Sequence, residues 1–123
     1  MSFEMLLGTG LVTPDDWIVV LITPPEELGA PVYKIFSGWR FRDEWRLSSG
    51  TEDLSEIEDC GHYFSWRQSS GSLYHLHKNN SANFTEYVNA MLYKMVIKPA
   101  RDYQFNVEFL NVAELEKAIS TAC

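Results

Sequence analysis

The sequence lacks the features of a disulfide scaffold, a secreted protein and a membrane span. Its two cysteines, Cys60 and Cys123, form no CxxC pair, which argues against a disulfide framework or a zinc site. The longest apolar run covers residues 17–22, far short of the about 20 residues that a membrane helix requires. No basic residue precedes Lys34, so the charged start of a secretory signal is missing. We therefore expect free thiols, a cytoplasmic location and no membrane partner.

Catalytic motifs are absent as well. The chain contains no GxSxG elbow, no P-loop and no GxGxxG fingerprint, so acyl transfer, nucleotide hydrolysis and dinucleotide binding have no support. Cys60 and His62 flank Gly61, a spacing that rarely brings a thiol and a base within hydrogen-bond reach. The sequence therefore favours a protein with no catalytic residue and no cofactor. Carboxylates that folding brings together leave enzymatic activity open.

Positive charge is scarce. The 10 basic and 17 acidic residues give a net charge of −7, which repels phosphate backbones, so we expect no nucleic-acid partner. Five carboxylates lie close together in the chain: Glu52, Asp53, Glu56, Glu58 and Asp59. We favour the interpretation that this acidic cluster is a solvated face that keeps the protein soluble. The alternative is a surface that attracts a basic partner protein.

What the sequence does contain is a globular composition. The 123 residues are 46% hydrophobic and 22% charged, which is well outside the range of disordered chains. No repeat, low-complexity tract or long linker divides the chain. Residues 1–123 are therefore expected to form a single domain.

The first half of the chain predicts a series of strands. Residues 17–23 are apolar and β-branched, which is typical of a strand buried on both faces at the centre of a sheet. The two prolines that follow would end this strand before a turn or one helical turn over residues 26–31. Further strands are expected at residues 32–39 and 45–48, with a weak edge strand at 54–58.

Residues 62–78 predict a β-hairpin whose register can be deduced from its side chains. A loop of Ser69, Ser70 and a left-handed Gly71 pairs Phe64 with Leu76, Trp66 with Tyr74, and Gln68 with Ser72. One face of the hairpin is then wholly apolar, whereas a slip of one residue would mix apolar and polar side chains. The other face carries Tyr63, Ser65, Arg67, Leu73, His75 and His77.

The second half of the chain predicts two helices. Apolar residues recur at helical spacing over residues 83–97, and Lys98 with Pro99 is expected to end this helix. Residues 103–109 alternate as a half-buried strand, and a capping box of Asn111 and Glu114 indicates a second helix over residues 112–122. We therefore predict an α+β fold: a mostly antiparallel sheet of five to seven strands with the helix at 83–97 packed on it.

The hairpin also carries the only candidate ligand pocket. His75 and His77 share one strand face as an HxH pair, beside Tyr63 across the strand. A metal site needs a third strong ligand, and in this register His62 points to the opposite face, so we expect no bound metal. Tyr63, His75 and His77 remain candidates for lining a small-molecule pocket.

Residues 39–46 concentrate aromatic and basic side chains within an acidic protein. Trp and Arg often anchor protein interfaces, so these side chains are candidate partner contacts. They are Trp39, Arg40, Arg42, Trp45 and Arg46. We favour the alternative that Trp39, Phe41 and Trp45 belong to the core, with the arginines paired to Asp43, Glu44 or the acidic cluster.

Four short motifs carry a family resemblance. They are GW at residues 38–39, WRLSSG at 45–50, SGSLY at 70–74 and HK at 77–78. Together, over about residues 39–78, they resemble a pattern in small uncharacterised proteins encoded by mobile gene cassettes of bacterial integrons. The resemblance implies a bacterial cytosolic protein with an accessory function, often oligomeric. It assigns no functional residue.

Three functional hypotheses follow from these observations. The first is a non-catalytic interaction module that forms a homodimer through an aromatic-rich sheet face or edge. The second is an inhibitor or immunity-type protein that binds a basic partner through the acidic cluster. The third is a small-molecule-binding domain or enzyme with a pocket between sheet and helix, near His75 and His77.

Overall fold

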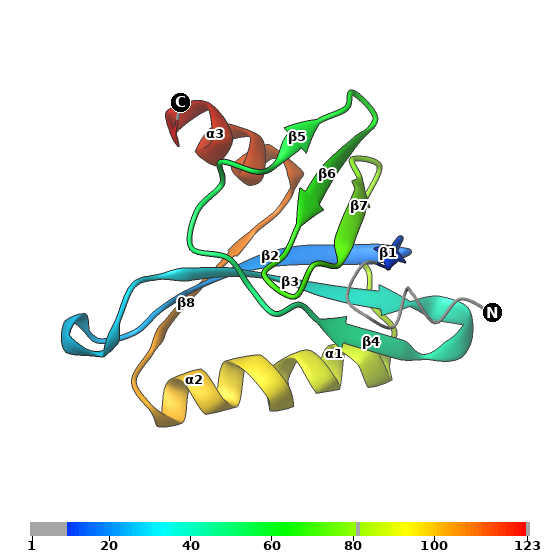
Figure 1. Ribbon diagram of the computed structural model, residues 1–123. Helices are drawn as coiled ribbons and strands as arrows, with labels where there is room; N and C mark the ends of the chain where they lie inside the picture. Colours follow the sequence, from blue (N-terminus) through cyan, green and yellow to red (C-terminus); the bar gives the residue numbers. More distant parts are fainter. Residues whose placement is uncertain (1–9, 81, 123) are drawn as a thin grey trace.

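The structure is a computed structural model that describes residues 10–80 and 82–122. Figure 1 shows three layers: a long helix below, a four-stranded sheet in the middle, and a second four-stranded sheet with the C-terminal helix above. The α+β class predicted from the sequence is confirmed. Within the described residues, no helix is both long and apolar enough to cross a membrane.

The middle layer, called the central sheet, is antiparallel throughout. Its order is β4-β3-β2-β8, with the following bounds: β2 Asp16–Thr23, β3 Val32–Trp39, β4 Glu44–Leu47 and β8 Asn106–Leu110. β2 is an interior strand, as its unbroken apolar sequence predicts. Trp17 and Val19 face one core cluster and Val20 the other, because successive side chains of a strand point to opposite faces.

The upper layer, called the hairpin sheet, contains the predicted hairpin. Its order is β1-β7-β6-β5, with the following bounds: β1 Leu11–Val12, β5 Glu58–Asp59, β6 Tyr63–Arg67 and β7 Leu73–His77. The register is the predicted one, with Phe64 opposite Leu76, Trp66 opposite Tyr74, and Gly71 left-handed at φ 98°. The four apolar side chains of this hairpin face are all buried.

Two helical segments complete the layers. The long helix comprises α1 (Glu86–Leu92), a π-helical turn (Tyr93–Ile97) and α2 (Lys98–Asp102), and its apolar stripe covers the central sheet as predicted. The C-terminal helix α3 (Val112–Ala122) begins at the predicted capping box, in which Asn111 and Glu114 exchange backbone-to-side-chain hydrogen bonds of 2.9 Å. Lys78 joins α3 to the hairpin sheet by ion pairs of 2.8 Å to Asp59 and to Glu116.

The strands divide between two sheets, where the sequence indicated one. β2 has apolar side chains on both faces, and the helix covers one of them. Trp17 and Val19 on the other face need a second apolar surface, which the buried face of the hairpin supplies. The hairpin therefore packs on the central sheet instead of extending it.

Several element boundaries differ from the prediction. The long helix begins at Glu86 instead of residue 83, because the Thr85 hydroxyl caps it by accepting from Val88 N. β8 begins at Asn106 instead of residue 103, because the chain first reverses at the left-handed Gln104.

The strand expected at residues 54–58 is reduced to β5, because the Asp53 carboxylate accepts hydrogen bonds from Ser55 and holds the chain in a turn. The long helix does not end at Pro99 but continues to Asp102. The π-helical turn explains this, since Lys98 donates to Tyr93 O, five residues back, and the wider turn relieves the clash that proline causes in a regular helix.

Candidate functional site: a pocket between the helix and the central sheet

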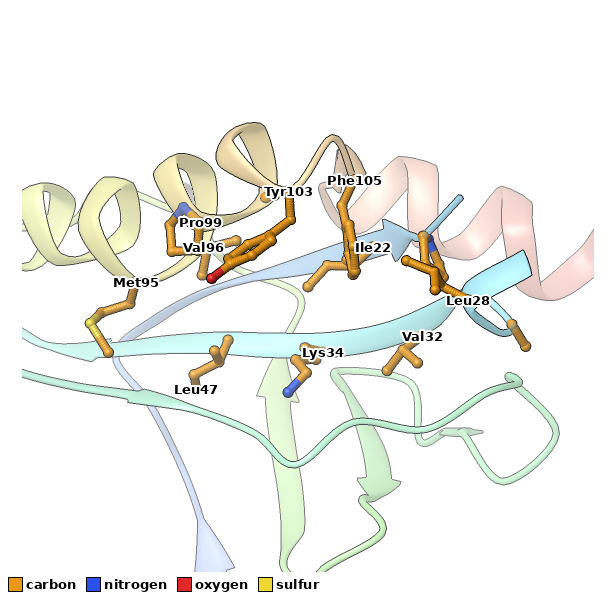
Figure 2. Close-up of a pocket in the computed structure, with 13 residues that line it drawn as sticks. Ile22, Leu28, Val32, Lys34, Leu47, Met95, Val96, Pro99, Tyr103 and Phe105 are labelled. Atoms are coloured by element: carbon orange, nitrogen blue, oxygen red, sulfur yellow. The ribbon is translucent and has the colours of Figure 1, made fainter. Parts of the chain in front are cut away.

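A cavity of about 400 Å³ lies between the long helix and the edge of the central sheet. Figure 2 shows helix residues on one side and strand residues on the other. This volume is within the range of about 300–1,000 Å³ that is typical of small-molecule sites. The helix and the central sheet therefore leave a space between them that is large enough for a small ligand.

Strands and their connection form one wall. Ile22 comes from β2, Val32 and Lys34 from β3, and Leu47 from the end of β4. The loop between β2 and β3 adds Pro24, Leu28 and Ala30. Beyond β4 the chain passes tightly along this wall, since a Cβ at Gly50 would lie 2.7 Å from Val32 Cγ1, and Gly50 has a φ of 102°. Glycine is required at this position because of the close contact with Val32 and because of the positive φ.

The long helix forms the other wall. Met95 and Val96 come from the π-helical turn, and Pro99 and Ala100 from α2. Turns of this kind occur frequently at functional sites, because they shift side chains out of the regular helical positions. Here the turn and the proline that accompanies it both face the cavity.

A second irregularity completes the pocket at the end of the helix. Gln104 has a left-handed φ of 63°, and Phe105 N donates a 2.7 Å hydrogen bond back to Ala100 O. A left-handed non-glycine residue costs about 1–2 kcal/mol. This reversal places Tyr103 and Phe105, the two residues beside Gln104, in the pocket lining. Strain at such a position is common next to binding sites.

The lining is apolar except for two side chains. Lys34 is the only charged residue among the described residues that line the pocket, and Tyr103 supplies the only phenol hydroxyl. In Figure 2 the Tyr103 ring extends from the end of the helix, with its hydroxyl directed toward the strands. An apolar cavity with a few polar groups is typical of a small-molecule site.

Exposed apolar side chains gather at the pocket. Eight large hydrophobic side chains are exposed among the described residues, and three of them line this cavity. These three are Leu28, Met95 and Tyr103, with 64%, 43% and 73% of their surface exposed. Exposed apolar surface that is contiguous with a cavity indicates a place where a ligand or partner is bound.

No family model, curated protein or solved structure matches this chain. The resemblance of residues 39–78 to integron cassette proteins therefore stays a prediction. The candidate site rests on its geometry.

The hairpin residues proposed as a pocket lie elsewhere, on the outer face of the hairpin sheet. The Tyr63 ring is 4.7 Å from that of His75 and 6.4 Å from that of His77, so the three side chains do gather as the register predicts. The neighbouring Cys60 thiol, which is free and exposed, raises the pKa of the Tyr63 hydroxyl. Cys123 lies outside the described residues. Tyr63, His75 and His77 do not line the cavity under the helix.

The segment at residues 39–46 forms the turn between β3 and β4. Trp39 and Trp45 are half-buried, but Phe41 is 99% exposed, so its expected place in the core is wrong. The physical reason is the tight turn over Arg40–Arg42, followed by Asp43 in a left-handed conformation, which lifts Phe41 off the sheet.

The three arginines of this segment have different partners. Arg40 binds the buried Asp16 carboxylate through two hydrogen bonds of 2.7 and 2.9 Å, a partner that the sequence did not indicate. This pair raises the pKa of Arg40. Arg42 pairs with Glu44 at 3.2 Å, as expected. Arg46 donates to Ser72 at 3.1 Å and lies over the Tyr74 ring.

The acidic cluster is exposed, as expected of a solvated face. Asp53 accepts hydrogen bonds from Ser55, and Asp59 accepts from Lys78; each set of bonds lowers the pKa of its carboxyl group. Glu52, Glu56 and Glu58 form no ion pair with any residue in the ranges that the structure describes. The cluster's role as a docking surface for a basic protein stays a prediction.

Sequence reasoning missed the pocket residues themselves. The sequence pattern places Leu28 in a turn, Met95 on the apolar stripe of a helix and Tyr103 in a strand. One signal was present in the sequence. The amphipathic pattern before Pro99 continues after it, which points to an irregular helix instead of a helix end.

Proposed function

We propose that this protein is a small-molecule-binding domain whose ligand lies between the long helix and the central sheet. The observation that carries the proposal is the apolar cavity of about 400 Å³, bordered by exposed Leu28, Met95 and Tyr103. The irregular turns at residues 93–97 and at Gln104 support it, because both direct side chains into the cavity.

A neutral apolar fluorophore, N-phenyl-1-naphthylamine, tests this proposal. We expect saturable fluorescence enhancement with one site per chain, and a rise in unfolding free energy of about 2.7 kcal/mol at a free concentration of 100 times Kd. The Ala100→Phe substitution should remove this binding, since Ala100 is buried and lines the cavity. The added ring has empty space to occupy, so the variant should remain folded.

Ala90→Phe is the matched control, because Ala90 is exposed on α1 and does not line the cavity. It should bind the fluorophore like the unsubstituted protein. Equal binding by Ala100→Phe, with both variants folded by circular dichroism, would contradict the proposed site, as would an absence of saturable binding to the unsubstituted protein.

Self-association is a second candidate function, and Phe41 is the observation that favours it. Its side chain is 99% exposed on the β3–β4 turn, where it borders one hollow, and other residues of the same segment line a second hollow. Leu11, Trp39 and Trp45 line one hollow together with Arg42, Glu44 and Arg46. An aromatic ring that enters it would meet apolar side chains and the faces of two guanidinium groups. In a two-fold dimer, each Phe41 would enter a hollow of the other copy, so the rings of both copies would be buried.

Light scattering on a size-exclusion column tests the dimer. We expect the mass of two 14.2 kDa chains, independent of loading concentration, and the mass of one chain for Phe41→Ser. Tyr87→Ser is the control, since Tyr87 is an exposed aromatic residue on α1, and it should leave the dimer intact. A monomeric unsubstituted protein would rule out this function and leave the pocket proposal untouched.

A further inference from the structure

We infer that the ligand of the pocket is an amphiphilic carboxylate, held with its hydrocarbon body under the helix and its carboxylate at Lys34. This inference rests on the proposed small-molecule function and specifies its chemistry. Three properties of the lining lead to it: the placement of one ammonium group, the absence of acidic neighbours in the described part of the lining, and the size of the apolar space.

Lys34 is placed as an anion receptor. The side chain is half-buried on β3, and its aliphatic stem runs beside Gly50, where a Cβ would lie 3.3 Å from Lys34 Cγ. Its ammonium group forms no hydrogen bond or ion pair with any side chain in residues 10–80 or 82–122, whereas Lys78 and Lys98 are both paired. A partly desolvated ammonium without a counter-ion gains most from a charge-assisted hydrogen bond to an anion.

The charge of the lining selects the sign of the ligand. No acidic side chain lines the pocket within the described residues. The lining therefore has no group that would attract a cationic ligand beside Lys34, and none that would repel a carboxylate. The protein as a whole carries a net charge of −7, which makes a local cation necessary for an anionic ligand to bind. The one ammonium and the Tyr103 hydroxyl are few donors for a doubly charged phosphate, and they suit a single carboxylate better.

The remaining surface selects the body of the ligand. Apart from Lys34 and Tyr103 the lining is hydrocarbon, so a sugar or nucleotide would leave its hydroxyl and amide groups without partners. A cavity of about 400 Å³ holds about a dozen non-hydrogen atoms, given that a water molecule occupies about 30 Å³ of liquid. A carboxylate with an aliphatic chain of medium length matches both the volume and the surface.

Displacement of N-phenyl-1-naphthylamine by decanoate, decanol and decylamine tests the inference, because the three differ mainly in the head group. We expect decanoate to displace the fluorophore at a concentration about tenfold lower than decanol, the difference expected for one charge-assisted bond. Decylamine should be the weakest of the three, because its ammonium group meets Lys34. The preference for decanoate should shrink as salt is added.

Substitutions of lysine assign the preference to one side chain. Lys34→Met should abolish the advantage of decanoate over decanol, measured as the ratio of their displacing concentrations in that same variant, and Lys34→Arg should retain it. Lys94→Met removes the same charge from an exposed position outside the pocket, and we expect it to behave like the unsubstituted protein.

Failure of this inference can be told apart from failure of the proposed function. If the fluorophore binds and Ala100→Phe blocks it, but decanoate and decanol compete equally, the pocket stands and the carboxylate preference is overturned. A preference that survives in Lys34→Met would also overturn it. If the fluorophore does not bind at all, the small-molecule function fails together with the inference.

Discussion

Replacing Trp17 with alanine is expected to lower the free energy of unfolding by about 3–5 kcal/mol, the range measured for large aromatic residues in protein cores. Trp17 is fully buried on β2, on the face that meets the hairpin sheet. Its ring packs edge-on against Phe64 at 6.3 Å, and its indole N–H donates a 2.9 Å hydrogen bond to His77 O. One side chain thus joins the two sheets by both packing and a hydrogen bond.

Urea denaturation followed by circular dichroism measures this loss. A domain of this size is stable by about 5–15 kcal/mol, so the loss in Trp17→Ala is a large share of the total and a milder variant complements it. Trp17→Phe keeps most of the apolar surface and leaves His77 O without its donor, for which we expect a smaller loss of about 1–3 kcal/mol. Tyr87→Ala, at an exposed position, should change stability by less than about 0.5 kcal/mol. Similar values for the Trp17 and Tyr87 variants would show that the sheets do not depend on this contact.

Replacing Arg40 with methionine is expected to cost about 2–3 kcal/mol. The Asp16 carboxylate, only 1% exposed, receives two hydrogen bonds from the Arg40 guanidinium and would be left buried without them. Breaking a fully buried ion pair costs about 3–5 kcal/mol, and the value here is smaller because the Arg40 side chain is 54% exposed. This pair also fixes the turn that presents Phe41.

Two further variants show whether the loss of stability comes from the buried Asp16 carboxylate or from the removal of any positive charge. Arg42→Met removes a pair that is exposed at both ends, so it should change the unfolding free energy by less than about 1 kcal/mol. Adding Asp16→Asn to Arg40→Met removes the buried charge and should restore part of the lost stability. If Arg40→Met and Arg42→Met are equally stable, the Asp16 pair contributes no more than a surface contact.

The small-molecule proposal and the dimer proposal concern different parts of the molecule. The pocket lies between the helix and the edge of the central sheet, whereas Phe41 lies on the β3–β4 turn. Their test variants do not overlap, so each result can be interpreted without the other.

Local pattern determined most of the secondary structure. The hairpin register follows from the segregation of apolar side chains, because pairing Trp66 with Tyr74 is the arrangement that buries one whole face. The start of α3 follows from the Asn111 and Glu114 capping box, whose hydrogen bonds span only three residues. Features of this kind depend on interactions between neighbours in the chain or across one turn, and for that reason the sequence alone was sufficient to predict them.

The tertiary structure decided which surfaces meet, and with them the site. The Arg40–Asp16 pair, the burial of Trp17 against the hairpin and the pocket beside Lys34 each join residues from separate elements. Apolar patterning requires that a face be covered but does not say by which element, nor where the cover leaves a gap. The sequence therefore determined the elements and their core faces, and the packing of the layers determined where a ligand can bind.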